Sequence, residues 1–458
     1  MTPTELRATS GLAAIYAVRM VGLFMVLPVL VLYTGVLPGA TPFLMGLALG
    51  VYGLTQALLQ IPFGILSDRV GRRPLIALGL VLLIVGSVVA ALAETVYGLI
   101  VGRALQGSGA VAAVVLALTA DLITEERRTR ALAVIGLSIG LTFTAAMVLG
   151  PLVDRWFGLS GIFWLTAGLG VVALLLLFFW VPRPLHSLPH PDMVPIRGGL
   201  SQVLRDRELM RLNVGVFILH MTLAANFLVL PLMLVTGLDL PPAQHYQVYL
   251  PVLVLGFALM IPMVIRAERR RALKSSLLVA IAVLLVVQGL LPFANHWLIL
   301  GLVLVLFFAA FNLLEAMLPS LVAKTAPVIE KGTAMGVFAS SQFLGIFAGG
   351  VFGGALMAYV GPTGVFALGL VGAMLWLVVA GTMAPPSHLS NRAYGLPPPW
   401  RSAVGELESR IGELAGVGEV RVSAHEGAVY LKVDPACFDE GGLRVLFTSW
   451  PAQSTERN

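Results

Sequence analysis

Long apolar stretches separated by short polar breaks run along the chain from Ser10 to Met383. Each stretch is close to the roughly 20 apolar residues that an α-helix needs to cross the hydrocarbon core of a bilayer. Helices also satisfy their backbone hydrogen bonds internally, as lipid requires. The pattern therefore predicts an all-α membrane protein with twelve transmembrane helices, at residues 9–37, 41–65, 74–93, 97–120, 131–153, 160–181, 210–236, 245–265, 275–294, 296–320, 332–359 and 363–383.

Composition agrees with a membrane environment, because 58% of the 458 residues are hydrophobic and 11% are charged. An ordinary soluble domain has about 25% charged residues, so a water-soluble fold could not cover this much apolar surface. The lipid bilayer is therefore the expected partner of most of the chain. Cys437 is the only cysteine, so no paired-cysteine motif predicts a metal site. We expect no metal and no cofactor.

The positive charges indicate how the chain is oriented. Most of the 29 Lys and Arg residues fall in alternate connections between spans, and the opposite connections contain only Arg155. Cytoplasmic connections carry the excess of Lys and Arg, so we expect both termini in the cytoplasm. The first span contains Arg19 and shows no clear cleavage site, which favours a retained helix over a signal peptide. The net charge of +6 is thus a topology signal, and we expect no nucleic-acid partner.

The longest polar break, residues 182–208, separates six spans from six and is rich in proline. We interpret it as a cytoplasmic linker between an N-terminal bundle, residues 1–181, and a C-terminal bundle, residues 209–383. A flexible proline-containing connection of this kind suits two halves that move relative to each other.

A short internal echo supports this division. Ile61-Pro62 followed by Asp68-Arg69 returns 200 residues later as Ile261-Pro262 followed by Glu268-Arg269. Such an echo is typical of a duplicated six-helix unit whose halves rock about a central site. Chance matches in apolar sequence are the alternative interpretation.

A charged motif follows the second span, where the chain reads Gly64-Ile65-Leu66-Ser67-Asp68-Arg69-Val70-Gly71-Arg72-Arg73-Pro74. It resembles the signature loop of the major facilitator superfamily, although a basic cytoplasmic loop is also expected from topology alone. The resemblance implies a tight turn that acts as a latch between the two halves. Asp68 would face the positive N-terminal end of the eleventh span, near Gly332 to Met335. The implied latch residues are Gly64, Asp68, Arg69, Gly71, Arg72, Arg73 and Asp121, with Arg72 paired to Asp121.

Two further segments resemble superfamily motifs. Arg103 to Ala110 in the fourth span is similar to a motif whose arginine serves proton coupling, and an arginine at membrane depth usually faces the bundle interior. The alternative is that Arg103 snorkels to the nearer interface. Glycines of the fifth span, up to Gly150-Pro151, resemble the antiporter motif, but Val153-Asp154 replaces the usual glycine pair and weakens that expectation.

Polar residues inside the other spans are candidates for the central site. Glu315 and His220 join Arg103 as proton-coupling candidates, because a carboxyl in apolar surroundings holds its proton more tightly and histidine titrates near neutral pH. The cavity candidates are Arg19, Gln56, Asn226, Asn312 and Gln342. The alternative for each is a structural hydrogen bond between helices. Because the N-terminal bundle has intramembrane arginines without an intramembrane carboxylate, an anionic or neutral amphipathic solute would suit the cavity.

The resemblance extends over nearly the whole chain, through runs such as Arg19 to Gly22, Asn312 to Ala316 and Gly332 to Gly336. It is greatest to bacterial inner-membrane members with a small cytoplasmic tail domain of ferredoxin-like form. It implies the inner membrane as the location and proton-driven efflux as the activity, with the proton gradient as the energy source.

The tail supports an α+β domain at residues 400–458, after a proline-rich linker at 384–399. A helical stripe that includes Leu407 and Ile411 precedes two alternating strands and a second stripe that includes Leu443. A domain this small is marginal on its own, so docking, self-association or a regulatory ligand is expected; a simple stabilising appendage is the alternative.

These features favour a secondary active transporter of a small solute or drug-like compound, coupled to protons and working by alternating access. A transporter-like sensor that signals through its tail is the alternative. The sequence shows no nucleophile with a base inside the bundle and no phosphate-binding Gly-rich loop with Lys, so neither an enzyme nor direct ATP drive is expected.

Overall fold

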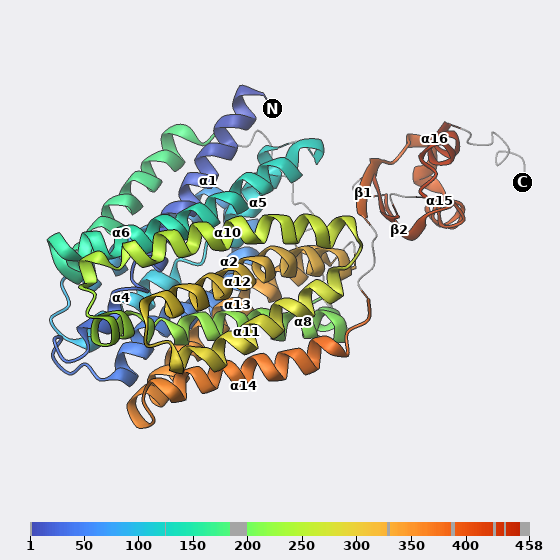
Figure 1. Cartoon of the computed structure of the whole chain (residues 1–458). Helices are drawn as coiled ribbons and strands as arrows, with labels where there is room; N and C mark the ends of the chain where they lie inside the picture. Colours follow the sequence, from blue (N-terminus) through green and yellow to red (C-terminus); the bar gives the residue numbers. More distant parts are fainter. Residues whose placement is uncertain are drawn as a thin grey trace, which may run out of the picture.

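The computed structural model describes residues 2–123, 125–183, 199–327, 330–385, 390–424, 427–434 and 437–448. Within these ranges the chain forms a bundle of long helices, with a small domain of strands and short helices at one end (Figure 1). Most of the predicted linker 182–208 lies outside the described residues, as does the end of the tail after residue 448.

The first half of the bundle has its helices in the expected order. It consists of α1 (Pro3–Phe24), the short helix η1 (Leu30–Tyr33), α2 (Pro42–Val70), α3 (Arg72–Ala91), α4 (Val96–Ser108), α5 (Ala112–Leu122), α6 (Glu125–Leu175) and η2 (Leu176–Trp180). Gly158 interrupts α6 with a φ of +63°, which makes it two helices joined at a kink. This kink lies between the predicted fifth and sixth spans.

The second half follows the same plan. It consists of α7 (Gly199–Arg205), α8 (Arg207–Asn226), α9 (Leu230–Leu232), η4 (Met233–Gly237), η5 (Pro242–Gln244), α10 (Tyr246–Arg269), α11 (Leu273–Leu290), η6 (Leu291–Phe293), α12 (Trp297–Thr325), α13 (Lys331–Tyr359) and α14 (Pro362–Gly381). Pro62 lies inside α2 and Pro262 inside α10, so the echo in the sequence falls on equivalent helices of the two halves.

Three predicted spans are not continuous helices. The predicted span 9–37 is wrong as a single helix, because α1 ends at Phe24 and turns follow. Pro28 has no backbone N–H and its ring would clash with the carbonyl of Phe24, four residues earlier. Pro231 causes a similar break after α8. The fourth span is broken between α4 and α5, where Gly109 packs against the backbone of Gly79.

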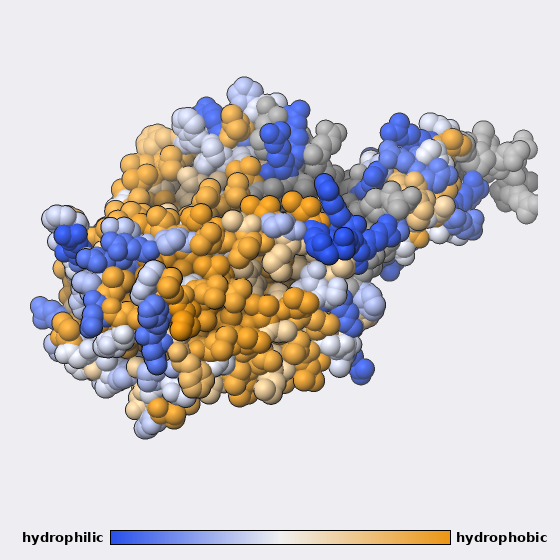
Figure 2. Space-filling view, in the orientation of Figure 1, coloured by the Kyte–Doolittle hydropathy of each residue, from blue (hydrophilic) through white to orange (hydrophobic). Residues whose placement is uncertain are grey.

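The bundle has the surface of a membrane protein. A wide apolar belt covers α10, α11 and α14 and is flanked by polar residues at both ends (Figure 2). Ten helical segments of the described residues are long and apolar enough to cross a membrane. The 47-residue segment Val134–Trp180 counts once among them, and α1 is not included.

The two halves are packed closely at one end of the bundle. We call this end the Pro42 end and the opposite end the Val70 end, after the limits of α2. A Cβ added to Gly50 would lie 2.8 Å from the carbonyl oxygen of Phe347, and one added to Gly53 would lie 2.5 Å from that of Phe343. Such distances are possible only where the backbones of α2 and α13 nearly touch.

Such close backbone contacts are not found at the two glycines nearer the Val70 end. A Cβ added to Gly64 of α2 or to Gly336 of α13 would have no atom within 4 Å. The glycine-mediated contact between the halves is therefore concentrated toward the Pro42 end.

The tail folds into a sheet with two helices. The order along the chain is β1 (Ser390–Gly395), η7 (Pro398–Ser402), α15 (Val404–Gly412), β2 (Val417–Ser423), β3 (Ala428–Val433) and α16 (Glu440–Thr448). The three strands are antiparallel in the order β1-β3-β2, which is consistent with a ferredoxin-like domain. Leu407, Ile411 and Leu443 pack with Val429 and Leu431 in its core, as the helical stripes predict.

The strand β1 was not expected, because the predicted linker 384–399 includes all of it. Its sequence, Ser-Asn-Arg-Ala-Tyr-Gly, has no apolar alternation. It is held instead by its ladder with β3, in which Asn391 pairs with Lys432 and Ala393 with Tyr430. Tertiary pairing, and not local propensity, makes this segment a strand.

Candidate functional site

Three helices of the second half bring together a polar cluster of His220 from α8, Glu315 from α12 and Gln342 from α13. The amide nitrogen Nε2 of Gln342 lies 2.8 Å from Nε2 of His220 and 3.2 Å from Oε1 of Glu315. His220 Nε2 is 3.5 Å from Glu315 Oε2. The residues proposed from the sequence as separate candidates thus form one connected site.

The histidine has a defined hydrogen-bonding state in this arrangement. Its Nδ1 lies 3.1 Å from the carbonyl oxygen of Val216, which can only accept, so Nδ1 carries a proton. In the neutral ring, Nε2 then accepts from the Gln342 amide. A proton added at Nε2 would replace this hydrogen bond with an ion pair to Glu315, so the cluster has two alternative arrangements.

Glu315 is not buried as the sequence predicted. Its side chain is 38% exposed, whereas that of His220 is 6% exposed. Glu315 is on α12 in the middle of the bundle, and a proton could reach it from water.

The first half contributes a second polar cluster. The Arg19 guanidinium is buried, and its Nη2 donates to the side-chain oxygen Oε1 of Gln56 and, at 3.3 Å, to the hydroxyl of Tyr52. Gln56 in turn donates to Gln60 at 2.9 Å. Of these residues, Tyr52 and Gln60 were not candidates in the sequence analysis. Both lie on α2, and Gln60 is one helical turn after Gln56, a spacing that could have identified it.

Arg103 lies in the interior of the first half and does not snorkel to an interface. It is fully buried, with Nη1 2.9 Å from Gln106 Oε1 and Nε 3.4 Å from the carbonyl oxygen of Ala48. Its guanidinium carbon lies 4.9 Å from the centre of the Tyr52 ring. Tyr52 therefore contacts both buried arginines, Arg19 through its hydroxyl and Arg103 through its ring.

The two polar clusters face a common region between the halves. Tyr16 of α1 lies within electrostatic range of Arg19 and Tyr52 from its own half and of Glu315 from the other. Aromatic rings also join the halves, because Phe143 of α6 lies 6.0 Å from Phe308 of α12, between ring centres. The centre of the bundle thus combines charged groups and aromatic surface contributed by both halves.

The structure does not bring Asn226 and Asn312 into this network. Asn312 is buried and its Nδ2 has no hydrogen-bond partner among the described residues. Neither amide atom of Asn226 has one within the same ranges. Their roles as cavity residues stay predictions.

The charged motif at residues 64–74 differs from the turn that the sequence predicted. Residues 64–70 continue the helix α2 and Arg72 begins α3, so the turn is Gly71 alone, with a φ of +98°. This left-handed conformation is open to glycine and strained for other residues. The prediction of a longer turn is therefore corrected to a single residue between two helices.

Arg72 makes the contact with Asp121 that the motif implied. Its Nε lies 2.8 Å from Asp121 Oδ2, and its Nη1 donates to the hydroxyl of Ser67 at 2.8 Å. Both ionic side chains are nearly buried, with 7% and 4% exposure. The contact links α2, α3 and α5 within the first half. A role as a latch between the halves stays a prediction.

The other members of the motif have separate positions. Arg73 donates to the carbonyl oxygens of Leu177 at 2.6 Å and Pro182 at 3.0 Å, and so caps the end of η2. Arg69 is exposed. The side chain of Asp68 lies outside the described residues, so its predicted position near Gly332 is not described.

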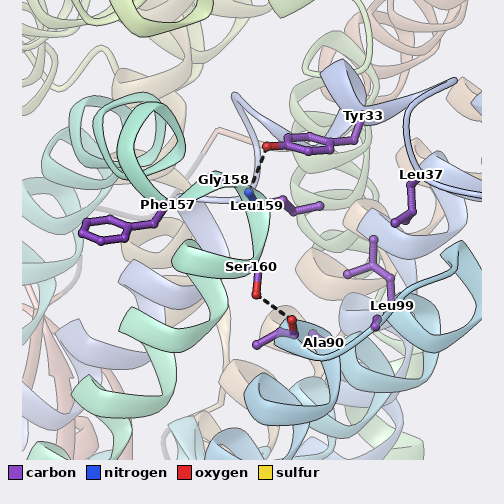
Figure 3. A pocket seen from close by; sticks show the side chains of 10 residues that line it. Tyr33, Leu37, Ala90, Leu99, Phe157, Gly158, Leu159 and Ser160 are labelled. Atoms are coloured by element: carbon purple, nitrogen blue, oxygen red, sulfur yellow. Dashed lines mark hydrogen bonds between the residues drawn. The ribbon is translucent and has the colours of Figure 1, made fainter.

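A polar group at the Pro42 end was missed in the sequence. Tyr33 donates to Asp154 Oδ1 at 2.7 Å. Its hydroxyl also accepts from the backbone N–H of Leu159 at 2.9 Å, next to the kink at Gly158 (Figure 3). Tyr33 and Leu159 line a cavity of about 290 Å³ together with Leu37, Leu99 and Ser160. Asp154 had stood out only as a departure from the antiporter motif.

A second missed site joins the tail domain to the bundle. Arg271 Nη2 lies 3.3 Å from Asp434 Oδ1, and Lys432 Nζ donates to the carbonyl oxygen of Thr325 at 3.4 Å. Lys324 and Glu419 line a cavity of about 230 Å³ at this junction. Docking was one of the roles that the sequence left open for the tail, but the sequence gave no signal for the residues involved.

Comparisons with known proteins agree with this architecture. A family model described as Major Facilitator Superfamily matches residues 12–350. The chain is 43% identical over 438 residues to the inner membrane transport protein YajR of Escherichia coli, covering 95% of each chain. It is 29% identical over 347 residues to the multidrug resistance protein MdtH of Aeromonas hydrophila, covering 74% of this chain and 84% of MdtH.

A solved structure has a similar fold. The crystal structure of the human organic anion transporter MFSD10 (TETRAN) matches with a TM-score of 0.61, covering 83% of this chain and 100% of that one. At 20% sequence identity, this likeness concerns the fold alone.

Proposed function

Because the chain belongs to the major facilitator superfamily, we propose that it is a proton-driven secondary transporter that exports a small solute by alternating access. The membership makes it a multi-pass membrane transporter and not an enzyme. The observation that carries the finer proposal is the His220–Gln342–Glu315 cluster, which connects three helices and contains a partly exposed carboxylate.

Twelve spans fit the architecture best. Ten segments are apolar and long enough, the segment Val134–Trp180 holds two spans joined at Gly158, and α1 adds the last. From the basic residues we infer that the Val70 end, both termini and the tail domain lie in the cytoplasm. In this orientation the close contact between α2 and α13 lies on the opposite side of the membrane, and the central site would be reached from the cytoplasm. The domain limits follow the polar breaks, with bundles at 1–181 and 209–383.

Proton coupling rests on the two arrangements of the cluster. With neutral His220, Gln342 connects the histidine and the carboxylate. With a proton at His220 Nε2 or on Glu315, that connection is replaced, and the packing of α8, α12 and α13 changes with it. A proton can bias the equilibrium between two conformations only through such differential contacts. Arg103 would affect the equilibrium between the same two conformations through its contact with the Tyr52 ring.

Efflux of drug-like compounds is the direction and solute class we favour. The MdtH relatives carry the name multidrug resistance protein, and the central region has the aromatic surface that apolar solutes need. The alternative, a sensor that signals through its tail, is favoured by the contacts of the tail domain with α12.

Flux distinguishes the two functions. Purified protein in lipid vesicles with an imposed pH gradient is tested for proton movement, followed with a pH-sensitive dye in the lumen, on addition of drug-like compounds. Solute-dependent proton movement is expected of a transporter. A protein that binds solutes and changes the exposure of its tail, yet moves neither solute nor protons, would instead be a sensor.

A further inference from the structure

Arg19 is a buried cation with unused hydrogen-bond donors. Its exposed fraction is 1%, and two of its nitrogens, Nε and Nη1, have no partner among the described residues. Only Nη2 is bonded, to two neutral groups, Tyr52 and Gln56. Guanidinium groups hold their proton at any physiological pH, so this charge cannot be relieved by deprotonation. A buried charge without a counterion is unfavourable and calls for an anionic partner.

The first half supplies no such partner within the part of the chain described. The neighbours Gln56 and Gln60 are amides, and the other ionic group that contacts Tyr52 is Arg103, a second buried cation. The Nη2 of Arg103 is also without a partner in those residues. The interior of the first half therefore carries two positive charges that share one neutral tyrosine.

Glu315 is the acidic group that faces this region, but it is already engaged by the second half. It accepts from Gln342 and lies beside His220. No hydrogen bond or ion pair between Arg19 and Glu315 occurs among the described residues. Arg19 and Glu315 thus lie on opposite halves, and both are within electrostatic range of Tyr16.

We propose that Arg19 binds the negative group of the transported solute, which is therefore an organic anion, a carboxylate or sulfonate. The unused Nε and Nη1 donors lie on opposite edges of the guanidinium, and either can donate a charge-assisted hydrogen bond to such a group. The aromatic residues supply the surface for the apolar body, because Phe311 lies 5.7 Å from His220 and 6.5 Å from Phe143, between ring centres. This inference rests on the proposed transport function and names its solute class.

A matched set of ligands tests the charge preference. Full-length protein in a neutral detergent is titrated with naphthalene-2-sulfonate, naphthalene-2-sulfonamide and trimethyl-2-naphthylammonium, which share one ring system and differ in charge. The sulfonate should bind about tenfold more tightly than the other two, as expected for charge-assisted hydrogen bonds. Arg19→Gln should remove this preference and leave sulfonamide binding unchanged. Arg19→Lys should keep part of it, since lysine retains the charge without the guanidinium donors.

Two control variants separate a specific site from a general charge effect. Arg155→Gln removes a cation from the exposed connection near the Pro42 end and should leave all three affinities unchanged. Glu315→Gln removes the opposing negative charge and should strengthen sulfonate binding. The proposal is overturned if the cation binds as tightly as the sulfonate, if none of the three binds, or if the preference survives Arg19→Gln.

The same ligands in vesicles separate this inference from the transport function. Sulfonate-dependent proton movement supports both. Proton movement driven by the naphthylammonium and not by the sulfonate would retain the transporter and reject the anion site. Sulfonate binding that depends on Arg19 without any flux would retain the site and reject transport.

Discussion

Gly46 and Gly350 bring the backbones of α2 and α13 together so closely that a Cβ added to Gly46 would lie 2.1 Å from the Gly350 carbonyl oxygen. The reverse substitution would place a Cβ 2.3 Å from the Gly46 carbonyl oxygen. No side chain can move aside to relieve either contact, since backbone atoms make both. In a transporter with two rocking halves, this pair would form the closed gate at the Pro42 end.

Gly46→Ala should therefore shift the protein toward the state that is open at the Pro42 end. Overpacking of this kind costs about 1–3 kcal/mol, enough to change the ratio of two conformations by about fivefold to more than a hundredfold. Spin labels at Thr41→Cys and Tyr359→Cys, in a Cys437→Ser background, should report a longer distance between the ends of α2 and α13. Gly350→Ala should act in the same direction.

Glycines without close neighbours provide the controls. Gly301→Ala in α12 has open space around its Cβ and should leave the label distance unchanged. Gly336→Ala is also unhindered in this state, but it lies where the halves would meet after rocking. It should leave the Pro42 end closed and slow transport. An unchanged distance in Gly46→Ala with normal transport would refute the gate.

The Arg72–Asp121 pair should matter more for stability than any exposed ion pair. Its side chains are nearly buried, and Arg72 also donates to the hydroxyl of Ser67. Asp121→Asn removes the negative partner of a buried cation and should cost about 3–5 kcal/mol. Thermal unfolding in detergent should show a clear loss. Lys324→Met breaks the exposed pair with Glu268 and should cost less than about 1 kcal/mol. Similar losses for both would contradict the argument.

The halves, the helix order and the polar residues of the centre could be predicted from the sequence, because apolar period and rare intramembrane charges are local signals. The features that could not be predicted from the sequence depend on tertiary contacts. The partial exposure of Glu315 depends on how the helices pack around it, which apolar neighbours along the chain do not reveal. The strand β1 exists through its pairing with β3. For the first predicted span, Pro28 was the signal in the sequence that the helix ends before residue 37, because proline breaks helices.

Glu315→Gln should separate solute movement from proton movement. Glutamine keeps the size and the acceptor oxygen that Gln342 needs, but it does not take up a proton. Exchange of solute across vesicles at equal pH should continue, whereas accumulation driven by a pH gradient should stop. Glu208→Gln, at the start of α8 and paired with Arg211, is the matched control and should behave as the wild type. Full gradient-driven accumulation in Glu315→Gln would exclude Glu315 as the coupling residue.

Lys432→Met should release the tail domain from the bundle. The Lys432 side chain is 8% exposed, lies 3.4 Å from Glu419 and donates to the carbonyl oxygen of Thr325 at the end of α12. A cation at a helix C-terminus stabilises its unpaired carbonyls, so its loss should free the last turn of α12. Hydrogen exchange in the full-length protein should become faster at residues 321–327, while the core of the tail domain stays protected. Arg410→Met breaks an exposed pair inside the tail domain and should leave that exchange unchanged.

Since α12 also carries Glu315, a docked tail would restrain the helix that holds the carboxylate, and Lys432→Met should then change the transport rate without abolishing it. If exchange and rate are both unaltered, the tail does not act through this contact.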